Sequence, residues 1–266
     1  MHLQLCPLFS GSSGNCVYIG TEETKILIDA GMSGVKIKNE LAQIGVNIEE
    51  IKGILVTHEH ADHIKSVGIL SRKYHIPVWA NAGTWNAMSG KIGNVDPECR
   101  IVFETGVDFY IGELDIRPFA TPHDAAESVG YAVTSGNKKV AVATDIGCIK
   151  NSWLNETEES DVLMLESNHD PNMLAAGSYP YELKRRIAGK YGHLSNDDAG
   201  KAAVELVKRG VHVIILSHLS HENNYPELAY QCVDYALREA QIIPGSDMIL
   251  DIAKRDSHGE LYSVGD

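Results

Sequence analysis

The sequence alternates short apolar runs with longer amphipathic segments, and this pattern predicts both strands and helices. The strand-like runs are bounded by glycine, proline, asparagine or aspartate. We predict strands at residues 3–8, 15–20, 25–29, 53–57, 77–80, 107–111, 114–120, 128–135, 138–144, 161–166, 211–217 and 248–253. We predict helices at about 35–44, 63–75, 83–89, 180–190, 196–209 and 226–240.

The segment 196–209 carries a complete set of helix signals. Ser195 can cap its amino terminus, Asp197 and Asp198 stand in the first turn, and Gly210 follows the last turn. Apolar residues recur between these ends at helical spacing. Strand-rich halves interleaved with such helices predict an α/β fold, a four-layer αβ/βα sandwich of two mixed β-sheets flanked by helices.

Length and composition narrow the class of protein. With 266 residues and 44% hydrophobic content, the chain can bury a large core, and we expect a single domain over residues 1–266. No run approaches the roughly 20 apolar residues that cross a bilayer, and residues 1–9 lack the pattern of a signal peptide. We therefore expect a cytoplasmic protein with no membrane partner, and leave the oligomeric state open.

The five cysteines show no CxxC spacing, so we expect them to be reduced and mostly buried.

The formal net charge is −13, with 36 acidic and 23 basic residues, so the protein as a whole repels polyanions. This balance argues against a general nucleic-acid coat protein. It does not exclude a nuclease, because bound divalent cations reverse the local sign of charge. The nearest basic cluster is Lys184, Arg185, Arg186 and Lys190, which we interpret as a solvated helix face.

The densest group of candidate ligands follows a short apolar run. Residues 58–63 read HEHADH, which places three imidazoles and two carboxylates in six residues. A turn after a strand lets His58 and His60 point to one centre, while Asp62 and His63, on the first turn of a helix, can reach a second centre nearby. Imidazole nitrogen and carboxylate oxygen suit zinc, manganese and iron alike. A solvated loop is the alternative, but the spacing and the position at a strand end favour a metal site.

HEHADH resembles the HxHxDH signature of the metallo-β-lactamase superfamily, and the similarity extends over almost the whole chain. It implies two divalent metal ions, zinc or manganese before iron or nickel. The ligands that it implies are His58, His60 and His123 for one ion, Asp62, His63 and His218 for the other, and Asp145 between both. It also implies that Asp29 orients a ligand from behind the site. Taken alone, Asp29, His123 and Asp145 would be ordinary loop residues, but all three follow apolar strands that should end on one edge.

Two residues further along resemble a pair that lies beside the metals in the nucleic-acid-processing branch of this superfamily. Glu166 stands in DVLMLESNHD, and His193 stands in a GHLS segment. Such a histidine could protonate a leaving alkoxide or bind phosphate, and the carboxylate would hold its tautomer. The alternatives are a strand-end surface charge for Glu166 and a neighbour of a helix cap for His193. The resemblance thus implies Asp62, His193 and Glu166 as catalytic residues, with Asp62 positioning the attacking hydroxide.

The loop at residues 10–16 and the segment SHLSHENNYPELA resemble the YycJ/WalJ-type members, small bacterial proteins described as 5′-to-3′ exonucleases. Ser10 and Gly11 fit a simple turn, and a role for Ser13 and Asn15 at a phosphate is left open. The chain has no room for the β-CASP insertion of larger superfamily nucleases. It also lacks the long arm of transfer-RNA 3′-processing enzymes, so neither specific activity is expected.

These observations predict a binuclear metal-dependent hydrolase of phosphodiester bonds, in the form of a 5′-to-3′ DNA exonuclease that uses a hydroxide activated by two metals. Its partner would be nucleic acid, DNA before RNA, or a small phosphodiester. A hydrolase of small or cyclic phosphodiesters keeps this chemistry and fits the acidic surface better. A thioester or β-lactam hydrolase is disfavoured by the pair of Glu166 and His193, and a non-catalytic interaction protein by the complete ligand set.

Overall fold

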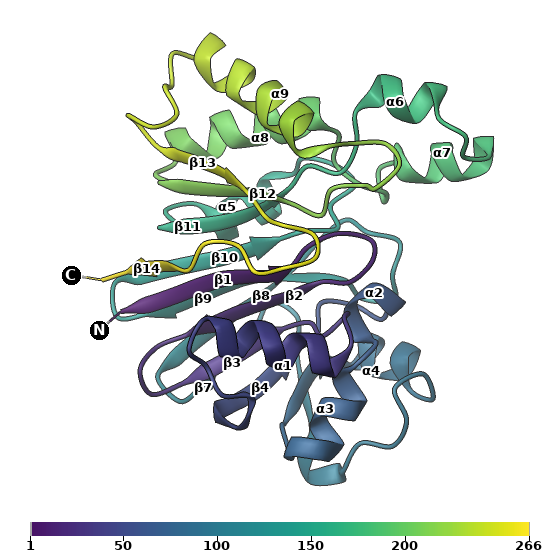
Figure 1. Ribbon diagram of the computed structural model, residues 1–266, viewed down its shortest axis with the longest axis vertical. Helices are drawn as coiled ribbons and strands as arrows, with labels where there is room; N and C mark the ends of the chain where they lie inside the picture. The colour runs from purple at the N-terminus through teal and green to yellow at the C-terminus, as the bar shows by residue number, and fades with distance from the viewer. Residues whose placement is uncertain (1, 266) are drawn as a thin grey trace.

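Two seven-stranded β-sheets pack face to face, and helices cover the outer face of each sheet (Figure 1). The computed structural model describes residues 2–265. Both sheets are mixed, with antiparallel pairs on one side and parallel pairs on the other. The predicted four-layer αβ/βα sandwich is therefore confirmed.

The first sheet has the order β14-β1-β2-β3-β4-β5-β6, in which the pairs up to β3 are antiparallel and those after it are parallel. Its strands are β1 (Leu3–Phe9), β2 (Cys16–Gly20), β3 (Lys25–Ile28), β4 (Ile51–Leu55), β5 (Val78–Asn81), β6 (Arg100–Phe103) and β14 (Tyr262–Val264). The burial of β2 on both faces follows from its place between the other sheet and a helical layer.

The second sheet has the order β13-β12-β11-β10-β9-β8-β7, with parallel pairs from β13 to β10 and antiparallel pairs from β10 to β7. Its strands are β7 (Phe109–Ile111), β8 (Leu114–Ala120), β9 (Val129–Ser135), β10 (Lys138–Ala143), β11 (Val162–Glu166), β12 (Val213–Ser217) and β13 (Ile249–Ile252). Every residue of β11 and β12 is buried, as expected for parallel strands covered on both faces.

The helices are α1 (Gly34–Gln43), α2 (Ala61–Ile64), α3 (Val67–Tyr74), α4 (Ala82–Met88), α5 (Asn151–Thr157), α6 (Pro171–Ala176), α7 (Tyr181–Ile187), α8 (Asn196–Lys208) and α9 (Pro226–Glu239), with 3-10 turns at Ile48–Glu50 and Pro97–Cys99. The predicted cap of α8 is confirmed, because Oγ of Ser195 accepts a hydrogen bond from the backbone of Asp198 at 3.1 Å.

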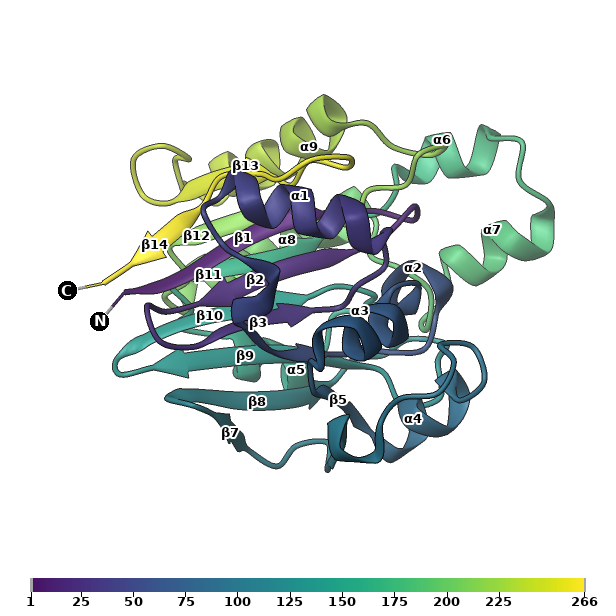
Figure 2. The same cartoon turned by 60° about the horizontal axis from the view of Figure 1, so that its bottom comes forward.

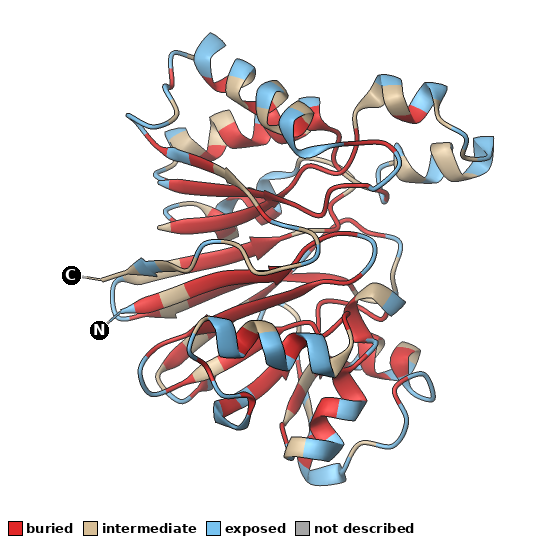
Figure 3. Ribbon diagram, in the orientation of Figure 1, coloured by how far each residue is buried: buried red, intermediate tan, exposed pale blue. Residues whose placement is uncertain are grey.

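Three apolar clusters hold the four layers together. One lies between the sheets and includes Ile28 and Val142. A second joins the first sheet to α1, α3 and α4, with Ile37 as a member, and a third joins the other sheet to α5, α8 and α9 around Trp153 and Val233. Figure 3 shows the result, with buried residues along the strands and exposed residues on the outward faces of the helices.

Several strands have their carboxyl ends at one edge of the sandwich. β3 and β4 run parallel, as do β10, β11 and β12, and β8 shares the direction of β10 because both are antiparallel to β9. The helices α2, α6 and α7 lie at the same end (Figure 2). Side chains that directly follow these strands are therefore brought close together.

The predicted helix over residues 63–75 is wrong as a single element. It is two helices, because the backbone N–H of Ser66 donates to the carbonyl of Ala30 at 2.8 Å and does not continue the first helix. Four short elements were not predicted: β6, β14, α5 and α6. Two of them are edge strands of only four and three residues, too short to show a period in the sequence.

Among residues 2–265, no helix has both the length and the apolarity needed to cross a membrane. The five cysteines are free, and Cys6, Cys16 and Cys99 are buried, in agreement with the prediction. Burial raises the pKa of the Cys6 thiol to about 12, so this side chain packs as a small apolar group.

Candidate metal centre

Asp29 holds His63 from behind the site. It directly follows β3 and has a left-handed backbone, with φ of 61°. Its Oδ2 accepts hydrogen bonds from Nδ1 of His63 at 2.7 Å and from Oγ1 of Thr57 at 2.8 Å, and its Oδ1 accepts from the backbone of Thr57 at 2.8 Å. Because Nδ1 of His63 is engaged in this way, its Nε2 is the nitrogen left to face a ligand.

The first group of ligand atoms comes from His58, His60 and His123, which offer nitrogens within 4.8 Å of one another. Nδ1 of His123 lies 3.1 Å from the carbonyl of Gly192, and its Nε2 lies 3.4 Å from Nδ1 of His60. Burial lowers the pKa of His58, and the neighbouring His63 adds to the shift. His58 is thus held as the neutral imidazole, which is the form that binds a metal.

The second group comes from Asp62, His63 and His218, again with ligand atoms within 4.8 Å of one another. Oδ2 of Asp62 lies 3.5 Å from Nε2 of His63 and 3.6 Å from Nε2 of His218. Burial opposes ionisation of Asp62, but the charges and hydrogen bonds of His63 and His218 outweigh it and lower its pKa. The carboxylate is therefore ionised at neutral pH and available as a ligand.

Asp145 lies between the two groups. Its Oδ1 is 3.7 Å from Nε2 of His123 and 3.6 Å from Nδ1 of His218, and its Oδ2 is 3.5 Å from Nε2 of His63. The backbone of Asp145 is left-handed, with φ of 57°, and His218 is also left-handed, with φ of 55°. Such strain in residues other than glycine is typical of sites where a side chain must point in one direction.

Several buried polar atoms in this cluster have no hydrogen-bond partner among residues 2–265. They are Nε2 of His58, Oδ2 of Asp145 and Nε2 of His218. A buried polar atom without a partner costs free energy, which a divalent cation among these atoms would remove. The nitrogen and carboxylate donors and their spacing therefore fit two adjacent divalent ions.

Glu166, the last residue of β11, connects two histidines. Its Oε1 lies 2.8 Å from Nδ1 of His193 and 2.8 Å from Nδ1 of His218, while its Oε2 accepts from the backbones of Ile146 and Leu194 at 2.8 and 3.1 Å. Burial alone would raise the pKa of Glu166, but the two imidazoles bring it down to about 2. The ring of His193 lies between the two groups, with its centroid 5.0 Å from that of His123 and 5.3 Å from that of His218.

A family model described as the metallo-beta-lactamase superfamily matches residues 10–218, a range that ends at the last candidate ligand, His218. The chain belongs to the metallo-β-lactamase superfamily. It is 42% identical over 239 residues to a protein of Bacillus anthracis named exodeoxyribonuclease YycJ, and 40% identical over 242 residues to a protein of Streptococcus pneumoniae named exodeoxyribonuclease WalJ. In both cases the match covers 90% of each chain. The resemblance to YycJ/WalJ-type members is thus confirmed.

Two solved structures show the same fold as this chain. YhfI from Bacillus subtilis has a TM-score of 0.73 at 17% identity, over 97% of this chain and 99% of that one. A diphosphatase from the PhnP family has a TM-score of 0.68 at 18% identity, over 99% and 98% of the two chains. At this level of identity the likeness concerns the fold alone.

The structure brings together every residue that the superfamily resemblance implied. The metal-ligand candidates His58, His60, Asp62, His63, His123, Asp145 and His218 share one cluster, Asp29 contacts His63, and Glu166 contacts His193. The contact of Glu166 with His218 was not predicted. Nothing in the local sequence signals it, because the two residues lie on neighbouring strands and are far apart along the chain.

Four polar residues near this centre make contacts that the sequence did not predict. Ser10 was interpreted as a turn residue, but its Oγ accepts from the backbone of His218 at 2.8 Å. Nδ2 of Asn15 lies 3.1 Å from Nε2 of His63, and Asn168 donates to the carbonyl of His218 at 2.8 Å. Arg186 lies on the exposed helix α7, as the basic cluster predicted, yet it also lines the hollow at the cluster and pairs with Asp124.

Proposed function

We propose that this protein is a metal-dependent phosphodiesterase that acts as a DNA exonuclease in the 5′-to-3′ direction. One observation carries the proposal: Glu166 holds His193 beside two adjacent ligand groups, so that a proton donor stands next to the site where phosphate would bind. The similarity to two proteins named exodeoxyribonucleases supports DNA as the substrate.

We propose that His58, His60 and His123 hold one divalent ion, and that Asp62, His63 and His218 hold the other. Asp145 would contact both, since its two oxygens face both groups. When bound, divalent ions supply activated water near neutral pH and neutralise the charge of a phosphate. The donors present suit zinc, manganese or iron.

The protein side chains would supply orientation and proton transfer. Asp62 is partly exposed at the hollow, so its carboxylate can accept a hydrogen bond from the attacking water and direct its lone pair toward phosphorus. His193 donates from Nδ1 to Glu166, which leaves Nε2 as the nitrogen for exchange with substrate. His193 would give a proton from Nε2 to the leaving 3′ or 5′ oxygen, while Glu166 holds the ring in place.

Arg186 adds a positive charge at the same hollow. Its guanidinium pairs with Asp124, the residue after His123, and this contact aligns the side chain along the wall of the hollow, whose volume is about 360 Å³. A guanidinium presents several donors in one plane and suits a phosphate oxygen pair. We therefore propose that Arg186 binds a phosphate of the substrate strand.

The test uses one DNA strand and the same RNA strand, each labelled at the 5′ or the 3′ end, with manganese, zinc or magnesium in parallel. A 5′-to-3′ exonuclease releases a labelled mononucleotide at once from 5′-labelled DNA and gives a shortening ladder from 3′-labelled DNA. An Asp145→Asn variant serves as the control for contaminating nucleases. If the protein cleaves small phosphodiesters but neither the DNA nor the RNA strand, it is a small-molecule phosphodiesterase and not an exonuclease.

A further inference from the structure

We propose that the uncleaved part of a single DNA strand lies in the groove between α1 and α3. This strand groove is lined by Val35, Lys38, Lys65, Ile69, Lys73 and Tyr74. The inference rests on the proposed function and adds to it a binding surface that lies outside the metal cluster. It identifies the substrate as a strand of several nucleotides.

Shared lining residues link the strand groove to the metal centre by way of a second hollow. The hollow at the metal centre shares Ser12, His60 and Asp62 with a second hollow of about 700 Å³ that also contains Lys91. The second hollow in turn shares Lys65 with the strand groove, whose volume is about 580 Å³. The strand groove, the second hollow and the metal centre are therefore neighbours on the protein surface, within reach of one bound strand.

The charge of the strand groove matches a polyanion, whereas the second hollow carries the carboxylates of Glu59 and Asp62 beside its lysines. Lys38, Lys65 and Lys73 line the strand groove, and Lys91 lines the second hollow. All four are exposed, and within residues 2–265 none of them forms an ion pair with a carboxylate. No carboxylate is among the described residues that line the strand groove, although the net charge of the chain is −13. Local positive charge on an acidic protein attracts phosphates while the rest of the surface repels them.

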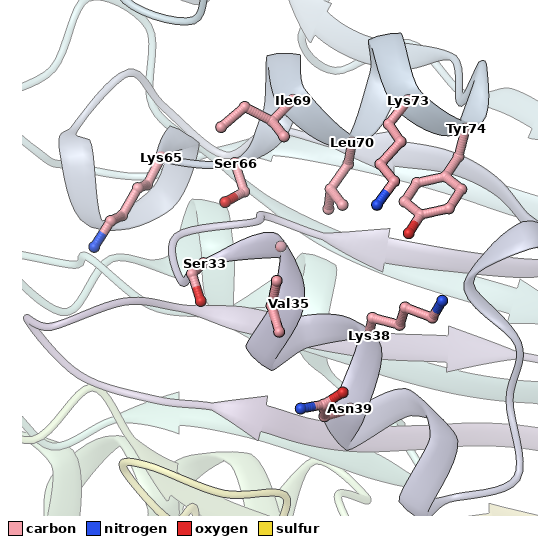
Figure 4. Close-up of a pocket in the computed structure, with 11 residues that line it drawn as sticks. Ser33, Val35, Lys38, Asn39, Lys65, Ser66, Ile69, Leu70, Lys73 and Tyr74 are labelled. Atoms are coloured by element: carbon pink, nitrogen blue, oxygen red, sulfur yellow. The ribbon is translucent and has the colours of Figure 1, made fainter.

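The floor of the strand groove offers apolar surface for bases. Val35 and Ile69 are 71% and 52% exposed, which is unusual for such side chains in a single patch. Nζ of Lys73 lies 5.1 Å from the centroid of the Tyr74 ring. Figure 4 shows Lys65 at one end of the groove, Lys38, Lys73 and Tyr74 at the other, and the aliphatic side chains between them. Single-strand-binding grooves combine cations for the backbone with aromatic and apolar surfaces for the bases in this way.

An acidic peptide would also suit lysines beside apolar side chains. The position of the groove favours the DNA strand, because the groove adjoins, at Lys65, the second hollow that shares Asp62 with the metal centre. The aliphatic side chains of Val35, Ile69 and Leu70 would contact bases irrespective of their identity, because every base has an apolar face. This fits an exonuclease that must move along a strand irrespective of its sequence.

The test compares a dinucleotide with a single DNA strand of about 12 nucleotides, within the usual site size of about 4–16 nucleotides for single-strand-binding folds. The dinucleotide reaches only the metal centre, so its kcat/KM is the internal reference. In Lys38→Gln/Lys73→Gln, the ratio of kcat/KM for the long strand to that for the dinucleotide should fall on the order of tenfold. The slope of log KM against log salt for the long strand should decrease by about 1.4, or about 0.7 for each phosphate that a lysine no longer neutralises.

The matched control is Lys52→Gln/Lys208→Gln, which removes two exposed lysines that line none of these hollows and should leave the ratio at the wild-type value. If the ratio and the salt slope are unchanged in Lys38→Gln/Lys73→Gln, the proposal that DNA lies in the strand groove is wrong. If the ratio falls in the control variant as well, the loss comes from the change in net charge, and this result would also contradict the proposal. Competition by an acidic peptide, with no competition by a DNA strand, would assign the groove to a protein partner. Failure of the wild-type protein to cleave either the long strand or the dinucleotide would instead overturn the proposed function.

Discussion

Glu166 and His218 are joined by a contact of 2.8 Å between Oε1 of the glutamate and Nδ1 of the histidine. The contact parallels that of Asp29 with Nδ1 of His63 at 2.7 Å. Both histidines of the second ligand group therefore have a buried carboxylate behind the ring, an arrangement that fixes the tautomer and raises the basicity of a metal-binding nitrogen. Because Glu166 also holds His193, a single carboxylate links the proposed metal ligand to the proposed proton donor.

The first prediction concerns metal content. We expect close to two transition-metal ions per chain, and Asp145→Ala should lower the occupancy of both sites because its carboxylate faces both ligand groups. Elemental analysis after reconstitution and desalting measures this directly. Absence of bound metal in the wild-type protein would contradict the assignment of the cluster.

His123→Ala and His218→Ala form a matched pair for the same measurement. Each should lose about one ion and keep the other, since each histidine belongs to one group only. Loss of both ions from either variant would mean that the two sites are not independent.

The second prediction separates two proposed roles of Glu166. It would orient the candidate metal ligand His218 and hold the proposed proton donor His193. Glu166→Gln keeps the shape but removes the charge behind His193 and His218, and we expect about 10- to 100-fold weaker binding of one ion together with a loss of rate. Asp29→Asn is the control, because His63 is the one histidine to which Asp29 is hydrogen-bonded within residues 2–265. At saturating metal, Asp29→Asn should recover most of the wild-type rate and Glu166→Gln should not. If both variants recover the wild-type rate equally, Glu166 acts only by orienting the candidate metal ligand His218.

The third prediction tests His193 as a proton donor. His193→Ala should keep both metals and the fold, because Ser195 and not His193 caps α8. Hydrolysis of a phosphodiester with an alkoxide leaving group should slow by about 10²- to 10⁴-fold. A substrate with an activated aryl leaving group needs little protonation and should be affected much less. If both substrates lose rate equally, His193 binds phosphate, and if neither does, it has no part in the reaction.

The fourth prediction concerns pH and metal uptake. Burial alone would lower the pKa of His218, but Asp145, Asp62 and Glu166 raise it to about 10 in the metal-free protein. A metal must displace this proton, so affinity should rise with pH by about tenfold per unit for each proton released, up to about pH 9. Isothermal titration in two buffers that differ in ionisation enthalpy counts the protons. Affinity that is independent of pH between about 6 and 9 would contradict the raised pKa.

The same shift predicts an opposite trend for the stability of the metal-free protein. A histidine whose pKa is raised on folding stabilises the folded state fully below its unfolded pKa of about 6.5 and loses that contribution as pH rises toward the folded value. The pKa of His63 is raised as well, by Asp29, Asp145 and Asp62 against the effect of burial. Thermal unfolding of the metal-free protein should therefore show a Tm that falls between about pH 7 and pH 10 and rises again when metal is added.

Much of the fold follows from local sequence features, and these were sufficient to predict it, whereas the distant candidate ligands His123, Asp145 and His218 were implied by the resemblance to the superfamily. HEHADH places its ligands within six residues at a strand end, and Ser195 with its acidic first turn specifies the start of α8 whatever surrounds it. Alternating apolar runs identify the long buried strands because burial on both faces demands apolar side chains. These features depend on neighbours along the chain.

Other features depend on contacts between residues that are far apart along the chain, and these were decided by the tertiary structure. Glu166 meets His218 only because β11 and β12 pair in parallel and in register, with Glu166 opposite Ser217. The helix predicted at 63–75 breaks because Ser66 bonds to the backbone of Ala30, and the strand groove exists because α1 and α3 pack side by side on the first sheet. A sequence pattern records whether a side chain is buried, but which two buried side chains meet follows from strand register and helix packing.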